Sequence, residues 1–140
     1  MLASLSGNTT STAPKEYVED LFDNYASRFE DSLVKKLGYE APKKLAEIVF
    51  ANHPKNSIGS ILDLGCGTGL VGAELKGSCS YLAGVDMSNA MLEEARKKDL
   101  YDELVHADIT TYLSREELEF DCFISADVFI YVGDLSNIFQ

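Results

Sequence analysis

Hydrophobic residues recur with two different periods along the chain, and the change of period divides it into two parts. From residue 15 to residue 37, apolar side chains return every three or four positions. This spacing predicts one amphipathic helix, or two helices that meet near residues 26–27. Gly38 is placed to end this segment, and Pro42 then stands near the first turn of a further helix that runs to about Ala51.

After a turn at residues 55–59, short apolar runs alternate with helical patterns. The runs predict four strands, at residues 60–64, 81–85, 104–107 and 120–125. The stretches that follow them predict helices at 70–76, 89–98 and 110–117, and a fourth that begins at Gly133. Such alternation requires right-handed crossovers, so we expect an α/β fold with a doubly wound parallel sheet.

The predicted helix at 89–98 has clear end signals. Ser88 is a suitable N-cap. The acidic residues Glu93 and Glu94 precede the basic residues and form two Glu–Lys pairs four positions apart, with Lys97 and Lys98. Acids before bases also match the helix dipole.

Charge and length restrict the class of protein. The chain has 140 residues, enough for one domain, and a formal net charge of -11. This charge repels phosphate backbones and anionic membranes, so we expect no nucleic-acid partner and no membrane partner. No apolar run reaches the length of a membrane span, and the N-terminal residues lack the pattern of a secretion signal.

The three cysteines, Cys66, Cys79 and Cys122, form no C-x-x-C pair. An odd number of cysteines without metal-ligand spacing predicts neither a disulfide framework nor a metal site. A reduced, cytoplasmic location fits this pattern best.

Each predicted strand ends in a polar or glycine-rich feature. The first strand leads into a glycine loop, the next two end at Asp86 and Asp108, and the fourth ends in Ser125-Ala126-Asp127. Ligands of open parallel sheets bind beyond the carboxyl ends of the strands, near the point where the strand order reverses. The sequence therefore predicts a ligand site at this edge.

The glycine loop fits the dinucleotide fingerprint G-x-G-x-x-G only in part. Gly65 and Gly67 match its first two glycines, but Leu70 stands at the third position and the remaining glycine, Gly69, comes one residue early. Asp63, just ahead of the loop, would face a pyrophosphate poorly. A ligand with a cationic end suits the loop better than NAD does.

At this point a family resemblance is clear. ILDLGCGTGL is similar to the first motif of class I S-adenosylmethionine-dependent methyltransferases, with the pattern D-x-G-x-G-x-G intact. The similarity continues through LAGVDMSNAMLEEARKK, VHADIT and FDCFISADVFIYVGDL. More narrowly, APKEYVEDLFDNYASRFEDSLVKKLGYEAPKKL resembles the segment that opens bacterial methyltransferases which follow tetratricopeptide repeats. The resemblance implies a Rossmann-like fold with S-adenosylmethionine as cofactor.

The resemblance also implies a domain organisation. Residues 1–14 are a linker or the remnant of an upstream domain, residues 15–53 are helices that close over the cofactor site, and residues 57–140 are the cofactor-binding portion. Only four strands are visible, fewer than the family sheet has, so we expect a fragment that holds the N-terminal half of the fold. The fourth strand is apolar on both faces, and its exposed edge favours self-association.

Roles for the strand-end residues follow from the resemblance. Gly65, Gly67 and Gly69 let the backbone approach the methionine part and the ribose of the cofactor, although such glycines also serve a tight turn without ligand. Asp86 binds both ribose hydroxyls, or caps the helix after Ser88. Asp108 binds the adenine amino group with the Ile109 N–H near a ring nitrogen, or caps the helix at Thr110.

Further cofactor contacts are implied around the methionine end. The negative charge of Asp63 stabilises the ammonium group of the cofactor, and its carboxylate is placed to bind loop N–H groups. Ala126 offers the same ammonium group a backbone carbonyl. Tyr25 either lies over the cofactor or packs in the core, and Arg28 is a weaker candidate for its carboxylate. Cys66 and Met87, which stands next to Asp86, complete the set of cofactor-binding residues. Cys66 is a small loop side chain without a partner histidine, so we expect no catalytic role for it.

Asp127 and Tyr131, just past the fourth strand, are the nearest candidates for catalysis or acceptor contact, and the acceptor itself is not identifiable. The sequence predicts an S-adenosylmethionine-dependent methyltransferase, whose isolated fragment need not be active. Two alternatives stay open: an NAD(P)-dependent oxidoreductase, and a non-catalytic relative that serves as an interaction module.

Overall fold

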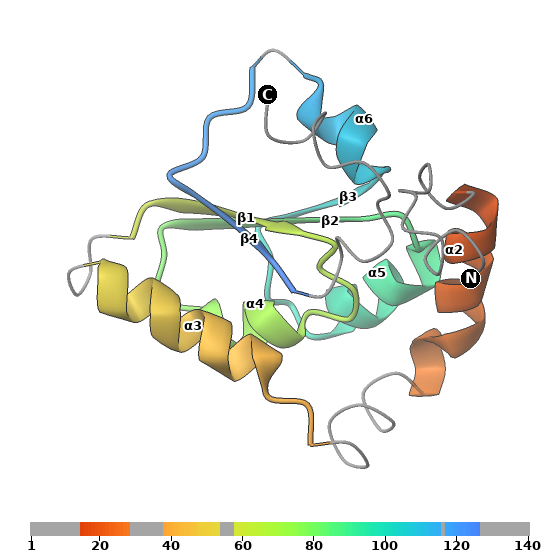
Figure 1. Ribbon diagram of the computed structural model, residues 1–140, viewed down its shortest axis with the longest axis horizontal. Helices are drawn as coiled ribbons and strands as arrows, with labels where there is room; N and C mark the ends of the chain where they lie inside the picture. Colours follow the sequence, from red (N-terminus) through yellow and green to blue (C-terminus); the bar gives the residue numbers. More distant parts are fainter. Residues whose placement is uncertain (1–14, 29–37, 54–57, 116, 127–140) are drawn as a thin grey trace, which may run out of the picture.

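The computed structural model describes residues 15–28, 38–53, 58–115 and 117–126, and its centre is a four-stranded parallel sheet. The strands lie in the order β3-β2-β1-β4. Figure 1 shows the sheet between the helices. The strand bounds are β1 Ser60–Leu64, β2 Tyr81–Asp86, β3 Glu103–His106 and β4 Cys122–Ser125. Every neighbouring pair is parallel, which confirms the predicted sheet.

Helices cover both faces of this sheet. In Figure 1, α3 (Ala41–Asn52), α4 (Leu70–Leu75) and α5 (Asn89–Lys97) lie below the sheet, and α6 (Ile109–Leu113) lies above it. α2 (Lys15–Tyr25) and a short 3-10 turn (Ala26–Arg28) lie beside α5. The break predicted near residues 26–27 is therefore confirmed. Helices on both faces make the fold doubly wound.

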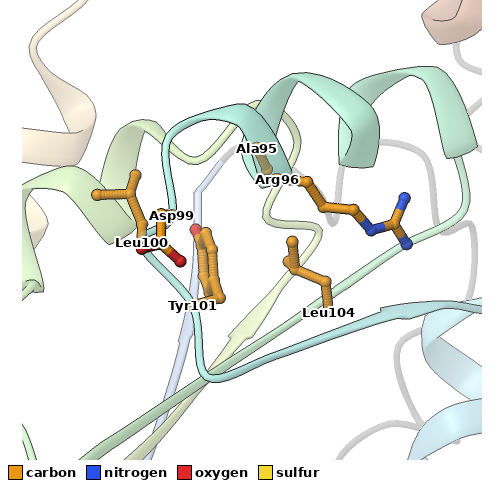
Figure 2. Close-up of a pocket in the computed structure, with 6 residues that line it drawn as sticks. All are labelled: Ala95, Arg96, Asp99, Leu100, Tyr101 and Leu104. Atoms are coloured by element: carbon orange, nitrogen blue, oxygen red, sulfur yellow. The ribbon is translucent and has the colours of Figure 1, made fainter.

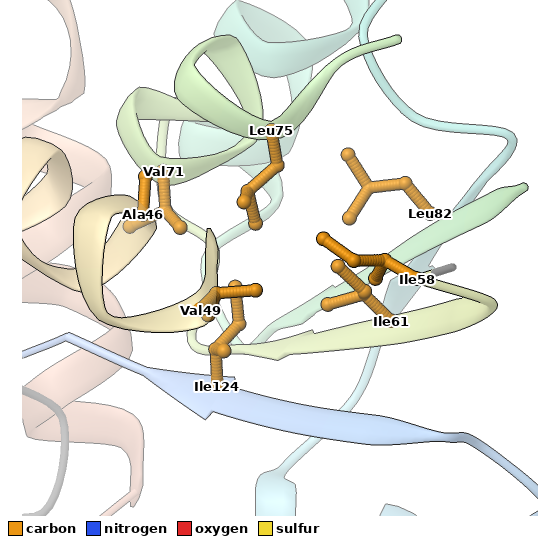
Figure 3. Close-up of a cluster of buried hydrophobic side chains, with 8 residues drawn as sticks. All are labelled: Ala46, Val49, Ile58, Ile61, Val71, Leu75, Leu82 and Ile124. Atoms are coloured by element: carbon orange, nitrogen blue, oxygen red, sulfur yellow. The ribbon is translucent and has the colours of Figure 1, made fainter. Parts of the chain in front are cut away.

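Two apolar clusters hold the layers together. The larger one, drawn in Figure 3, joins α3 and α4 to the sheet and contains the residues Ala46, Val49, Ile58, Ile61, Val71, Leu75, Leu82 and Ile124. On the other face, the α6 side chains of Ile109 and Tyr112 pack against β1 and β2. Because β1 lies between these clusters, it is buried on both faces from Ile61 onward, as a central parallel strand is.

Two predicted boundaries and one predicted ion pair were wrong. α6 ends at Leu113 instead of residue 117, because the chain turns where the Arg115 N–H donates to the Tyr112 carbonyl. β4 begins at Cys122 instead of residue 120, because Asp121 binds the start of β1 through its side chain: its Oδ2 accepts from the Ser60 N–H at 2.8 Å. On α5, Lys97 pairs with Glu94, three residues before it, at 2.8 Å rather than with Glu93.

Several predictions fall outside the described residues. These are the N-terminal linker, the helical pattern at 29–37, the helix after Gly133, and the candidates Asp127 and Tyr131. Among the helices that the structure describes, none combines the length and apolar character needed to cross a bilayer.

Candidate functional site

The glycine loop lies where the connections of the sheet change direction. From β1 the chain proceeds to β2 and β3 on one side, and it returns to β4 on the other side. The loop 65–69 leaves the carboxyl end of β1 between these two neighbours. This is the switch point at which open parallel sheets bind ligands, so the loop lies where we expected a ligand site, and binding there stays a prediction.

The loop has a backbone conformation that only glycine adopts readily. Gly65, Gly67 and Gly69 have φ values of 71°, 55° and 91°. The N–H groups of Gly65 and Cys66 both donate to the Val85 carbonyl, at 2.7 and 3.0 Å, so the loop folds over the end of β2. A Cβ added to Gly67 would meet nothing within 4 Å among the described residues. The loop therefore presents an open backbone surface to a ligand.

Asp86 fastens the loop to the end of β2. One oxygen of its carboxylate, Oδ2, accepts from the Gly67 N–H at 2.9 Å, and the other, Oδ1, accepts from the Ser88 N–H at 2.8 Å. Burial raises the pKa of Asp86, and the two N–H donors oppose this effect. We expected Asp63 to bind the loop N–H groups; for Gly67 this is wrong, because Asp86 reaches that group instead.

Asp63 lies beneath the loop on β1 and is 1% exposed. Its Oδ2 accepts a hydrogen bond of 2.7 Å from the Tyr101 hydroxyl. Burial raises the pKa of Asp63 to about 7; the Tyr101 hydrogen bond acts in the opposite direction, and the nearby charge of Asp86 adds to the increase. Two buried acids therefore stand together at the end of β1 and β2.

Tyr101 is the site residue that sequence reasoning missed. Its ring fits against glycines of three elements: a Cβ on Gly69, Gly72 or Gly84 would come within 3.2, 2.5 or 3.0 Å of it. A single tyrosine in the turn before β3 carries no sequence signal for this contact. Only the spacing of the glycines hints that a large side chain fills the space between α4 and the sheet.

α2 is attached to the same edge of the sheet. The Asp23 carboxylate accepts from the Ser88 hydroxyl at 2.5 Å and from the Ala90 N–H at 3.3 Å, at the start of α5. His106 of β3 has its Nε2 atom 3.6 Å from Glu19 and 2.7 Å from the Met87 carbonyl. These contacts bring α2 to the ends of β2 and β3.

At the C-terminal end of α2, Tyr25 is half-buried, and the Arg28 guanidinium lies 5.9 Å from the centre of its ring. Arg28 itself is exposed. The closure of this helix over a cofactor stays a prediction.

Asp108 caps α6. Its Oδ2 accepts from the N–H and the hydroxyl of Thr111, both at 3.1 Å, and from the Thr110 hydroxyl. The capping geometry that we considered as an alternative is thus present, although the helix starts at Ile109. The adenine contact stays a prediction. Ala126 directly follows β4 and packs, half-buried, against the larger core cluster.

Two polar side chains of the loop are buried. Burial raises the pKa of Cys66 well above its usual value, with the charges of Asp63 and Asp86 acting in the same direction, so the thiol keeps its proton and is a poor nucleophile. This agrees with its exclusion from catalysis.

Thr68 is 1% exposed, and its hydroxyl has no hydrogen-bond partner among the described residues.

A cavity of about 190 Å³ lies next to Tyr101, between α5 and β3. Figure 2 shows the side chains that line it: Ala95, Arg96, Asp99, Leu100, Tyr101 and Leu104. None of the predicted site residues is among them. Ala95, Leu100 and Tyr101 also lie within 4 Å of a Cβ built on Gly69, so the cavity adjoins the glycine loop.

Comparison with known proteins assigns the chain to a family. Residues 61–140 match the family described as methyltransferase domain. Over 72 residues the chain is 35% identical to the 18S rRNA (guanine-N(7))-methyltransferase of Bos taurus, a match that covers 51% of this chain and 26% of that protein. Over 87 residues it is 36% identical to methyltransferase-like protein 27 of Homo sapiens, which covers 59% of this chain and 34% of that protein.

The fold is shared with solved methyltransferases. Magnesium protoporphyrin IX methyltransferase from Synechocystis PCC 6803, solved with bound SAH, superimposes with a TM-score of 0.67 at 21% identity; the match covers 84% of this chain and 60% of that chain. The chain spans about a quarter to a third of the length of the two curated relatives above. These findings confirm the predicted methyltransferase domain and disfavour the NAD(P) alternative. The chain belongs to the methyltransferase domain family.

Proposed function

We propose that this chain binds S-adenosylmethionine over the glycine loop and that the whole protein transfers its methyl group to an acceptor. When bound, S-adenosylmethionine supplies a methyl group on a positively charged sulfur, which leaves as a neutral thioether. The observation that carries the proposal is the link between Asp86 and the Gly67 N–H, because it places a carboxylate and an open loop backbone side by side at the switch point.

The charge of the site supports this cofactor. Asp63 and Asp86 are both buried, and in the part of the chain that the structure describes neither forms an ion pair with a lysine or an arginine. Two buried acids without a lysine or arginine partner favour a ligand that brings positive charge, as the sulfonium and ammonium groups do. The pyrophosphate of NAD would meet the same acids with like charge.

We assign the parts of the cofactor as follows. The backbone of Gly65, Gly67 and Gly69 lies along the methionine part and the ribose. Asp86 still has one lone pair on each oxygen for the ribose hydroxyls, since each oxygen accepts one described N–H. Asp108 and the Ile109 N–H bind the adenine.

The methionine end would lie between α2 and the end of β4. Tyr25 covers it from α2, and Ala126 and Asp63 serve the ammonium group. Met87 lies next to the ribose, since it directly follows Asp86. In this arrangement the residues of the chain orient the cofactor and exclude water, which is most of what an in-line methyl transfer requires.

The acceptor and the partners are also part of the proposal. One relative is named for 18S rRNA guanine and one solved neighbour for magnesium protoporphyrin IX, so acceptors vary within similar proteins. For this chain the net charge of -11 favours an acceptor other than a nucleic acid. We propose that Asp127 and Tyr131 contact the acceptor and that the protein self-associates through the edge of β4. We also propose that the protein is cytoplasmic and that this domain follows tetratricopeptide repeats.

Calorimetric titration with S-adenosylmethionine, S-adenosylhomocysteine and NAD tests the cofactor. We expect the first two to bind and NAD to show no heat of binding. Asp86→Ala should weaken binding at least tenfold, since a charge-assisted hydrogen bond is worth about 1.5–3 kcal/mol. Asp121→Ala is the matched control, because this carboxylate also accepts a backbone N–H, from Ser60 at the opposite end of β1. Binding of NAD alone would refute the proposal.

A further inference from the structure

The hydrogen bond between Tyr101 and Asp63 joins two layers of the molecule beneath the glycine loop. Asp63 belongs to the central strand β1, and Tyr101 lies in the turn between α5 and β3, 38 residues later. The hydroxyl donates to Oδ2 of the carboxylate at 2.7 Å. Burial and the neighbouring Asp63 charge raise the pKa of Tyr101, so the hydroxyl keeps its proton and acts as the donor.

The ring of Tyr101 has little freedom to move. It lies against Gly69 of the loop, Gly72 of α4 and Gly84 of β2, each of which lacks the Cβ that would collide with it. Figure 2 shows the ring between Leu100 and Leu104, beneath α5. Because the ring is held on several sides, the direction of its hydroxyl is fixed, and so is the oxygen of Asp63 that receives it.

Few charged or titratable groups act on Asp63. The described ones are Tyr101 itself, Asp86 at the end of β2, and the Cys66 thiol of the loop, which stays protonated; Arg96 of α5 acts on Cys66. Asp86 raises the pKa of Asp63, and the Tyr101 hydrogen bond lowers it. Among these groups, Tyr101 is the hydrogen-bond donor that favours the ionised carboxylate over the neutral acid.

We propose that Tyr101 is a positioning residue of the cofactor site: through its hydrogen bond it holds the Asp63 carboxylate in the orientation and charge state that receive the ammonium end of S-adenosylmethionine. This inference rests on the proposed function, and it extends the site to a residue that lies outside the family motifs. Tyr101 does not touch the cofactor itself. It acts through Asp63 and, by its packing, through Gly69.

A pH dependence of binding follows. A cation binds the ionised form of Asp63 more tightly than the neutral form, so binding releases the proton that Asp63 carries at lower pH. With the pKa of Asp63 at about 7, affinity rises as the pH increases toward 7 and levels off above it. Removing the Tyr101 hydroxyl removes a donor that lowers this pKa, so the plateau then begins at a higher pH.

The test uses Tyr101→Phe, which keeps the ring and its packing and deletes the hydroxyl. S-adenosylmethionine is titrated by calorimetry into the wild type and the variant across pH 6 to 9. We expect the variant to bind about three- to tenfold more weakly at pH 7, the range that one hydrogen bond supports, and to reach its plateau at higher pH. The amino group of the ligand titrates equally in both series, so the difference between them belongs to Asp63.

Two further variants make the result specific. Tyr81→Phe is the matched control, because the Tyr81 hydroxyl also donates to a carboxylate, Glu103 at 2.8 Å, but at the opposite end of β2; its binding should equal that of the wild type at every pH. Asp63→Asn leaves Tyr101 in place. In this variant, the change in affinity between pH 6 and pH 8 should be no larger than the titration of the ligand alone produces.

Equal affinity and an equal pH profile for Tyr101→Phe and the wild type would overturn the inference, as would a pH profile of Asp63→Asn that matches the wild type. Absence of binding by the wild type at every pH would instead refute the proposed function. If Tyr101→Phe does not fold, a pH profile of Asp63→Asn that matches the wild type still overturns the inference.

Discussion

The Asp23 carboxylate of α2 lies 2.5 Å from the Ser88 hydroxyl at the start of α5. The same hydroxyl oxygen accepts the Met91 N–H, and Asp23 also accepts the Ala90 N–H, so one carboxylate and one serine together cap the helix. The cap therefore depends on a residue from another helix. The same contact attaches α2 to the edge of the sheet where the strands end.

We predict that Asp23→Ala loosens α2 and destabilises the fold by about 1 kcal/mol, because it removes one side of this cap. Hydrogen exchange should become faster in residues 15–28, and denaturant unfolding should report the loss of stability. Asp20→Ala, an exposed acid on the same helix, is the control and should change neither. Unchanged exchange in Asp23→Ala would show that α2 is held by other contacts.

A second prediction concerns Gly72. Alanine normally stabilises a helix over glycine by about 1 kcal/mol, but here its Cβ would lie 2.5 Å from the Tyr101 ring and hydroxyl. We expect Gly72→Ala to lower the free energy of unfolding by about 1–3 kcal/mol through overpacking.

The matching double variant identifies the cause. In a Tyr101→Ala background, which removes the ring, Gly72→Ala should become neutral or stabilising. A double-mutant cycle of unfolding free energies measures this coupling. If the two substitutions were additive, the close approach of Gly72 and Tyr101 would not be the reason for the loss.

The buried Asp63 makes stability depend on pH. Its pKa is about 7 in the folded chain against an ordinary value of 3.8, so the folded state binds a proton between these pH values that the unfolded state has released. The contribution of Asp63 to stability is therefore greatest below about pH 4, falls as the pH rises from about 4 to about 7, and is constant above.

Asp63→Asn removes this titration, so we expect the variant to gain on the wild type across the same range and to be more stable at pH 8 by roughly 2–4 kcal/mol. Urea unfolding at several pH values without ligand measures this, with Asp121→Asn as an exposed control. A constant difference between variant and wild type from pH 4 to pH 8 would contradict the assignment to Asp63.

At Thr68 we predict a substitution that stabilises the fold. Its buried hydroxyl has no partner in the described part of the chain, and an unsatisfied buried group costs about 1–3 kcal/mol. Thr68→Val keeps the shape of the side chain and should raise the free energy of unfolding by about 1 kcal/mol. Thr111→Val is the control and should lower it, since the Thr111 hydroxyl binds Asp108. A destabilised Thr68→Val would mean that the hydroxyl is satisfied.

The parts of the fold that depend on local pattern were predictable from the sequence. The apolar run before Asp63 marks β1, and Ser88 marks the start of α5, where its side chain accepts the Met91 N–H. Positive φ values at Gly65, Gly67 and Gly69 follow from the spacing of the glycines. Each of these features is decided by residues a few positions apart.

The contacts that complete the site were not predictable in this way. Tyr101 meets Asp63 across 38 residues, and Asp23 meets Ser88 across 65. Only the three-dimensional packing of α4, α5 and β2 determines which tyrosine reaches the acid. For the same reason we assigned the loop N–H groups to Asp63, although Asp86 binds that of Gly67.

The glycines of the loop differ in what a side chain would disturb, and this affects how their variants are interpreted. At Gly69 an added Cβ would press on Tyr101 and Leu100, whereas at Gly67 it would enter space that the described residues leave empty. Lost activity in a Gly69 variant is therefore ambiguous between misfolding and lost cofactor contact. In a Gly67→Asn variant, whose side chain tolerates the left-handed backbone, the same loss reports on the ligand. Screens that score activity alone would merge these two kinds of defect, and a thermal melt without ligand separates them.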